Sequence, residues 1–245
     1  MLSLREREHE RDGQLMAFDI GAKPTIALID RSTRGMDLAL FRGVLQRYVS
    51  HCVAPIWGTP AKLVTGADFV PGAWAMTFLD NADQANALAY HDLTPDGLPL
   101  ANVFVETIAS YGASLSVAAS HELVEMLVDP AINLFSLGPD NETDLWCYEA
   151  ADPVEADEDS FHLSGLQMSD FVTPAWFEGF RAPRSTRFDF THRVSRPFEL
   201  LPNGYQIILS GGQWTNIYGS EAKAAAFAAE DRRGHRSEIR KARRG

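Results

Sequence analysis

The chain has 245 residues, of which 45% are hydrophobic and 22% charged, and its formal net charge is −11. This composition is typical of a globular protein and argues against a disordered, collagen-like or coiled-coil chain, while the acidity argues against non-specific nucleic-acid binding by its body. No apolar run approaches the ~20 residues of a membrane span, and the charged start lacks a secretory signal. Two cysteines, Cys52 and Cys147, are too few for a disulfide framework, so we expect a reducing, cytoplasmic setting.

The first half of the chain alternates segments typical of strands and helices. Short apolar runs rich in β-branched residues predict four strands, at Pro24–Asp30, 61–66, Trp74–Asp80 and Leu100–Thr107. Apolar residues at helical spacing predict helices at Met36–Cys52 and Ser114–Pro130. Between the third and fourth strands, a Pro-Asp-Gly sequence within 93–99 indicates a tight turn.

The second half of the chain is irregular and acidic from Pro130 to Asp159, and β-rich after that. The pattern predicts a strand at Arg187–Val194. It also predicts strands on both sides of a Pro-Asn-Gly hairpin turn at 202–204. Because strands and helices are mixed without a regular βαβ repeat, we expect a single α+β domain.

The expected domain covers residues 16–220. A polar lead-in occupies residues 1–15, and residues 221–245 begin as a helix and end in a basic tail. We expect no membrane partner. Nucleic acid or an acidic protein is expected to contact the chain only through that tail, where the positive charge is concentrated.

The helix at Ser114–Pro130 carries the residues with chemical potential. It is apolar on most sides and should be buried, yet it contains His121, Glu122 and Glu125. His121 and Glu125 are four residues apart and share one face of the helix. Asp129, four residues after Glu125, lies on the same face. An unpaired buried carboxylate costs several kcal/mol, so a cation between these groups is the simplest way to stabilise them.

The spacing resembles His-Glu-x-x-His, in which the first and fifth residues ligate zinc and the second is the general base. Here the fifth residue is Glu125, and a carboxylate is also an acceptable zinc ligand. A third ligand is expected from Glu149 or Asp152, which are three residues apart and would face the same way on a helical turn. One would ligate the cation and the other would hold His121 by its second ring nitrogen.

Three alternatives stay open at this point. An oxygen-rich ligand set lowers the Lewis acidity of zinc and also suits Mn²⁺, Mg²⁺ or Ca²⁺. The ion could be purely structural. Without a metal, Glu122 and Glu125 would face solvent and pair with arginine.

The segments SHELVEMLVDP and YEAADPVEAD together resemble the HExxE variants of the zincin-type metallopeptidase family, which occur in phage-encoded and uncharacterised bacterial proteins. The resemblance implies a zincin-like α+β fold, with a mixed sheet whose edge strand lies beside the buried motif helix, followed here by a β-rich part. Leu100–Thr107 occupies the place of that edge strand. The resemblance also implies site residues: metal ligands His121, Glu125 and Glu149, general base Glu122, and Asp152 as a further ligand or as a residue that orients one.

The function implied by the resemblance is metal-dependent hydrolysis of a peptide or protein substrate, with Zn²⁺ as the cofactor and Mn²⁺ or Ca²⁺ as alternatives. The alternative function is a phage virion or assembly protein on the same scaffold, with a degenerate or structural metal site. Its partners would be other virion proteins, and the chain would be virion-associated. His162 and His192 are reserve ligands, whereas His91, next to the turn, could touch the cleft but is expected to be structural.

Overall fold

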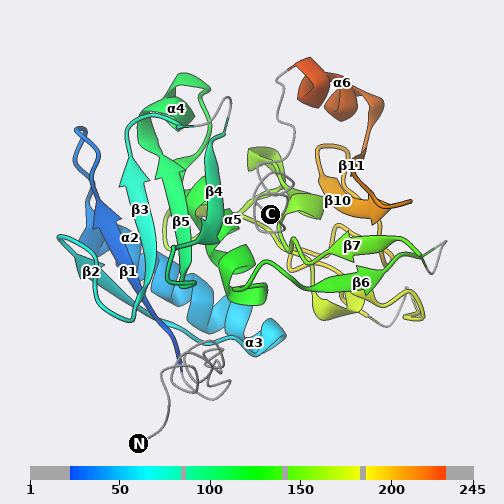
Figure 1. Cartoon of the computed structure of the whole chain (residues 1–245), viewed down its shortest axis with the longest axis horizontal. Helices are drawn as coiled ribbons and strands as arrows, with labels where there is room; N and C mark the ends of the chain where they lie inside the picture. The colour runs from blue at the N-terminus through cyan, green and yellow to red at the C-terminus, as the bar shows by residue number, and fades with distance from the viewer. Residues whose placement is uncertain (1–22, 84–86, 140–142, 183–185, 230–245) are drawn as a thin grey trace, which may run out of the picture.

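A five-stranded sheet forms the first half of the structure, a computed structural model that describes residues 23–83, 87–139, 143–182 and 186–229 (Figure 1). The strand order is β2-β1-β3-β5-β4, and every pair is parallel except β4 with β5. The strands are β1 (Thr25–Asp30), β2 (Lys62–Gly66), β3 (Trp74–Leu79), β4 (Ala89–Leu93) and β5 (Pro99–Phe104). All four strands expected in this region are confirmed, and the sheet is mixed.

The central strands read as continuous apolar runs because both of their faces are covered. In β1, Ile26 and Leu28 point into the main core, while Ala27 and Ile29 belong to a smaller cluster on the other face. This pattern is typical of inner parallel strands, which are buried on both sides.

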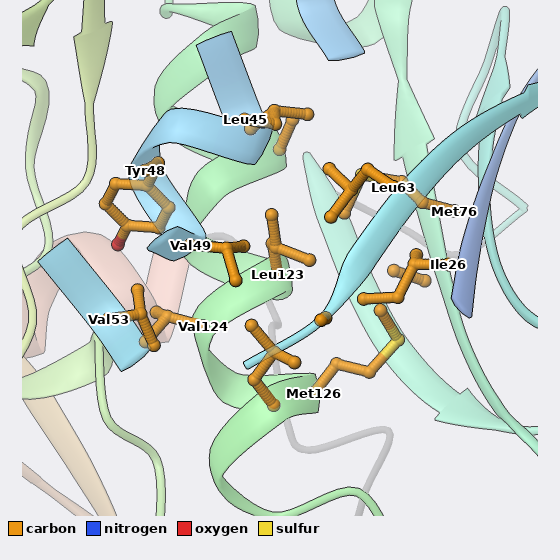
Figure 2. Close-up of a cluster of buried hydrophobic side chains, with 14 of the residues drawn as sticks. Ile26, Leu45, Tyr48, Val49, Val53, Leu63, Met76, Leu123, Val124 and Met126 are labelled. Carbon is orange, nitrogen blue, oxygen red and sulfur yellow. The ribbon is translucent and has the colours of Figure 1, made fainter. Parts of the chain in front are cut away.

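Two helices pack on the same face of the sheet. They are α2 (Leu38–Tyr48) and α5 (Leu115–Val128), both expected from apolar spacing. Figure 2 shows Leu45 of α2 and Leu123 of α5 in one cluster with Leu63 of β2 and Met76 of β3. Burying a side chain such as Leu123, which is fully buried, stabilises the fold by about 1.5–3 kcal/mol.

The first helix runs beyond its expected end. After α2 the chain continues through a π-helical turn at Val49–Val53 into α3 (Ala54–Trp57). Gly58 then ends the helical path in a left-handed conformation, with φ +72°. A residue without a Cβ adopts this conformation at no steric cost.

The prediction that Leu100–Thr107 forms the edge strand is wrong by one place in the strand order of the sheet. The strand within Leu100–Thr107 is β5, which lies between β3 and β4, so β4 is the last strand of the sheet order. The reason is the turn at 94–98, where Thr94 N–H donates to the Leu98 carbonyl at 2.8 Å. This turn makes β4 and β5 a hairpin and places β4 on the outside. Helix α5 packs against both strands, and α4 (Val105–Ser110) links β5 to it.

The second half is a β-rich part beside the first sheet (Figure 1), as expected. Its antiparallel sheet has the order β11-β10-β7-β6, and β8 and β9 form a separate hairpin. Aromatic side chains, among them Trp146, Trp176 and Phe198, form its core. The elements are β6 (Phe135–Leu137), β7 (Leu145–Cys147), β8 (Phe161–Leu163), β9 (Leu166–Met168), β10 (Tyr205–Ser210), β11 (Gln213–Tyr218) and α6 (Glu221–Ala229).

Two further expectations in this part are wrong. Residues Arg187–Val194 form no strand beyond one bridge between Asp189 and Val172. The Asp189 carboxylate accepts hydrogen bonds from the backbone N–H groups of Arg193 and Val194, which turns the chain instead of extending it. The residues before Tyr205 pack on Pro153 rather than forming a strand, so the hairpin turn lies at 211–212, where both glycines have positive φ.

The expected helical start of residues 221–245 is confirmed by α6, whereas the lead-in at 1–15 and the basic end after residue 229 lie outside the described residues. Within the described part of the chain, no helix is long and apolar enough to cross a membrane.

Candidate metal centre

Helix α5 brings three polar side chains into a buried environment. Ser114 caps its first turn by accepting a hydrogen bond from the Val117 N–H. Glu122 is 6% exposed and Glu125 3%, whereas the side chain of His121 is 13% exposed. The two carboxylates are therefore buried, whereas the imidazole of His121 is partly exposed to solvent.

A first triad joins His121, Glu125 and Asp152. His121 Nε2 lies 3.5 Å from Glu125 Oε2 and 3.2 Å from Asp152 Oδ1. Two donors on one tetrahedral zinc, with bonds of ~2.1 Å, are separated by ~3.4 Å. The two distances from His121 are close to this value, and all three donor atoms lie within 4.8 Å of one another, close enough for a metal ion.

Backbone contacts orient Glu125 toward this position. Its Oε1 accepts hydrogen bonds from the N–H groups of Ala151 and Asp152, at 3.2 and 3.4 Å. The other oxygen, Oε2, is the one that faces His121. Asp152 itself begins a 3₁₀ turn, Asp152–Val154, so the same short segment supplies one residue of the triad and orients another.

A second triad joins His91, Glu122 and Glu125. His91 Nδ1 lies 2.9 Å from Glu122 Oε2 and 3.4 Å from Glu125 Oε2. His91 is 5% exposed and sits in β4 opposite Ala101 of β5. The sequence predicts a structural role for this histidine, although the turn at 94–98 indicates that the residues on either side of it pair as a hairpin. Pairing the residues on either side of that turn places β4 outermost and next to the motif helix.

Glu149 and Asp129, both suggested by the sequence, lie outside the two triads. Glu149 is buried, 1% exposed, but the helical turn begins only at Asp152, so the two do not share a turn. Asp129 ends α5 and accepts hydrogen bonds from the N–H groups of Asn133 and Leu134. Its carboxylate closes the turn after the helix.

The buried position of Glu122 and Glu125 contradicts the alternative in which they face solvent and pair with arginine. Among the described residues, no lysine or arginine side chain is buried. The positive charge that balances these carboxylates must come from the imidazoles, from protons or from a bound cation.

The groups of the first triad shift one another's pKa values. Burial disfavours a charged imidazole at His121. The Glu125 carboxylate and the hydrogen bond to Asp152 outweigh it and raise the pKa of His121 well above its ordinary value. Burial and then the charge of Glu125 raise the pKa of Asp152. Without a metal the cluster therefore holds protons, and a cation would compete with them for the same oxygen and nitrogen atoms.

The second half of the molecule contributes Tyr205, at the start of β10. Burial, followed by the negative charge of Asp152, raises the pKa of the Tyr205 phenol well above its ordinary value. Lys223 of α6 lies 5.7 Å from the Tyr205 ring and pairs with Glu155 at 2.5 Å. No sequence spacing links Tyr205 to the motif helix, so only the fold reveals its position.

Comparison with known proteins adds no relative: no family model, no curated protein and no solved structure matches the chain. The fold and the site define the class instead. The chain is an α+β protein whose two buried triads, sharing Glu125, could hold a metal ion.

Proposed function

We propose that the chain is a metal-dependent hydrolase of peptide bonds, with the cation held by His121, Glu125 and Asp152. The observation that carries this proposal is the convergence of these three donor atoms at ligand spacing. One imidazole nitrogen and two carboxylate oxygens suit Zn²⁺, and the oxygen-rich set also suits Mn²⁺ or Ca²⁺.

A zincin-like fold is part of this proposal. The sequence His-Glu-x-x-Glu lies on a buried helix, α5, which packs against the end of a mixed sheet. The terminal strand is β4, which is antiparallel to its neighbour and carries His91 beside the motif. An extended peptide would add to the sheet along β4 by main-chain hydrogen bonds, beside the motif helix α5.

The residues divide the chemistry as follows. A bound cation supplies Lewis acidity and lowers the pKa of a water molecule. As catalytic base, Glu122 would take a proton from the attacking water and return it to the leaving nitrogen as the C–N bond breaks. His91, 2.9 Å from Glu122 Oε2, would hold this carboxylate in place.

The test is cleavage of casein or a mixed peptide library by the purified protein with added Zn²⁺. Glu122→Gln keeps the shape of the side chain but removes the base, so activity should fall by about 10²–10⁴-fold. The matched control is Glu158→Gln, in the same acidic segment as Asp152 but exposed, which should retain full activity. A chelator should abolish cleavage and added Zn²⁺ or Mn²⁺ should restore it. Equal cleavage by Glu122→Gln and wild type would refute the assignment of the base.

A further inference from the structure

We propose that the centre has a second divalent-cation subsite, formed by His91, Glu122 and Glu125, whose occupation switches the hydrolase off. This inference rests on the proposed function, in which the first cation binds between His121, Glu125 and Asp152. Glu125 would then bridge the two positions, because its Oε2 faces both imidazoles, at 3.4 Å from His91 Nδ1 and 3.5 Å from His121 Nε2.

The second triad has the geometry that a cation requires. Its three donor atoms converge, and all three residues are at least nine-tenths buried. Adjacent donors on an octahedral cation with bonds of ~2.1 Å are separated by ~3.0 Å, and those on a tetrahedral zinc by ~3.4 Å. His91 Nδ1 lies 2.9 Å from Glu122 Oε2, to which it is hydrogen-bonded, and 3.4 Å from Glu125 Oε2, so a cation would take the place of the proton between these donor atoms.

The charge of the site favours a second cation. The two triads contain three carboxylates, of Glu122, Glu125 and Asp152, and Glu149 is buried in the segment that leads to Asp152. One divalent cation balances only two of these four groups if all are ionised. Because no lysine or arginine of the described residues is buried, the remaining charge must be balanced by the imidazoles, by protons or by a second divalent cation, which would compete with those protons.

Occupation of this subsite removes the catalytic base. Glu122 Oε2 becomes a ligand, and a carboxylate held by a cation is a weaker proton acceptor than a free one. His91, which otherwise holds Glu122, is engaged by the same ion. We therefore expect activity to rise with the first equivalent of metal and to fall as the second binds.

The experiment counts bound ions. Metal-free protein, prepared with a chelator and dialysed, is equilibrated with increasing Zn²⁺, and bound zinc per chain is measured by elemental analysis. Wild type should bind two ions. His91→Gln, which removes the imidazole ligand but keeps a polar side chain, should bind one. The matched control is His162→Gln, at an exposed histidine of β8, which should still bind two.

Each count has a distinct meaning. One ion in the wild type overturns the second subsite and leaves the proposed function standing, whereas none overturns the proposed function itself. Two ions in His91→Gln overturn the assignment of His91 as a ligand. If His91→Gln does not fold, as judged by circular dichroism, Glu122→Gln replaces it, since the amide that it introduces is a poor ligand and should also reduce the count to one.

Discussion

Glu125 is the residue that unites the candidate centre. One of its oxygens accepts two backbone N–H groups, from Ala151 and Asp152, and the other faces both His91 and His121. The fifth position of a His-Glu-x-x-His motif is a histidine, which offers a single nitrogen to a metal. A carboxylate there has two oxygens, and this allows it to be oriented by backbone on one side while serving two triads on the other.

Replacing Glu125 by glutamine should weaken zinc binding at both positions. The loss should exceed the ~10–100-fold that removal of an outer partner of a ligand costs. The amide oxygen can still accept from Ala151 N–H, and one buried negative charge disappears, so the metal-free protein should be at least as stable as wild type. Calorimetric titration with Zn²⁺ and thermal melts of both metal-free proteins check the two outcomes. Unchanged zinc affinity would exclude Glu125 as a ligand.

At the scale of elements, α5 is fixed in place by polar contacts as well as by its apolar side chains. Ser120, fully buried in the helix, donates its hydroxyl to the Ser116 carbonyl at 2.7 Å and accepts from the Ser169 N–H at 2.8 Å. The second bond ties the motif helix to the chain that follows β9. The Ser120 hydroxyl therefore links the first half of the molecule to the second at the residue that precedes His121.

The substitution Ser120→Ala should destabilise the protein by about 1–3 kcal/mol, because it leaves the buried Ser169 N–H without this acceptor. The control is Ser110→Ala, at an exposed serine that donates to the Thr107 carbonyl, where the change should be within about 0.5 kcal/mol. Urea denaturation of the three proteins measures both differences. Equal midpoints for Ser120→Ala and Ser110→Ala would show that the buried contact contributes nothing.

At the scale of the whole molecule, the chain that enters β10 packs closely against the segment that carries Asp152, within the second half. A Cβ at Gly204 would lie 2.1 Å from the Pro153 carbonyl oxygen, so only glycine permits this approach of the chain entering β10. The next residue, Tyr205, begins β10, and β10 packs against the turn Asp152–Val154 that carries one triad residue.

Asp170, in the second half of the molecule, is a buried carboxyl group whose protonation should make the stability of the protein depend on pH. Its carboxyl group is 1% exposed and accepts hydrogen bonds from Phe171 N–H and from Thr191, whose hydroxyl also contacts Asp189 at 3.0 Å. Burial raises the pKa of Asp170 to about 8, and the charge of Asp189 adds to this, against the lowering effect of the Thr191 hydrogen bond.

The folded protein should thus keep a proton on Asp170 that the unfolded chain releases, so stability should fall as the pH rises from about 4 to about 8. The slope from this group is at most ~1.4 kcal/mol per pH unit. Asp170→Asn cannot titrate, and its stability relative to wild type should rise across this range and level off above it. Urea melts at a series of pH values measure the difference, with the exposed Asp96→Asn as control. Parallel curves for Asp170→Asn and wild type would refute the assignment.

Much of the first half could be predicted from local patterns. Four strands and two helices were found because apolar spacing reports which face of a segment is buried, and His121, Glu122 and Glu125 stood out as polar groups on an apolar helix. The strand at Arg187–Val194 was wrong, because side-chain hydrogen bonds to the Asp189 carboxylate competed with strand pairing. The alternation of apolar residues in that segment contains no trace of those bonds.

The sequence by itself determined the α+β class and the buried helix on which His121, Glu122 and Glu125 lie, since these follow from the periodicity of apolar residues. Only the tertiary structure decided that β4 is outermost, that His91 joins the site and that Asp152 rather than Glu149 completes the first triad. These facts depend on which distant segments meet, and sheet order and the path of an irregular loop leave no local pattern in the chain.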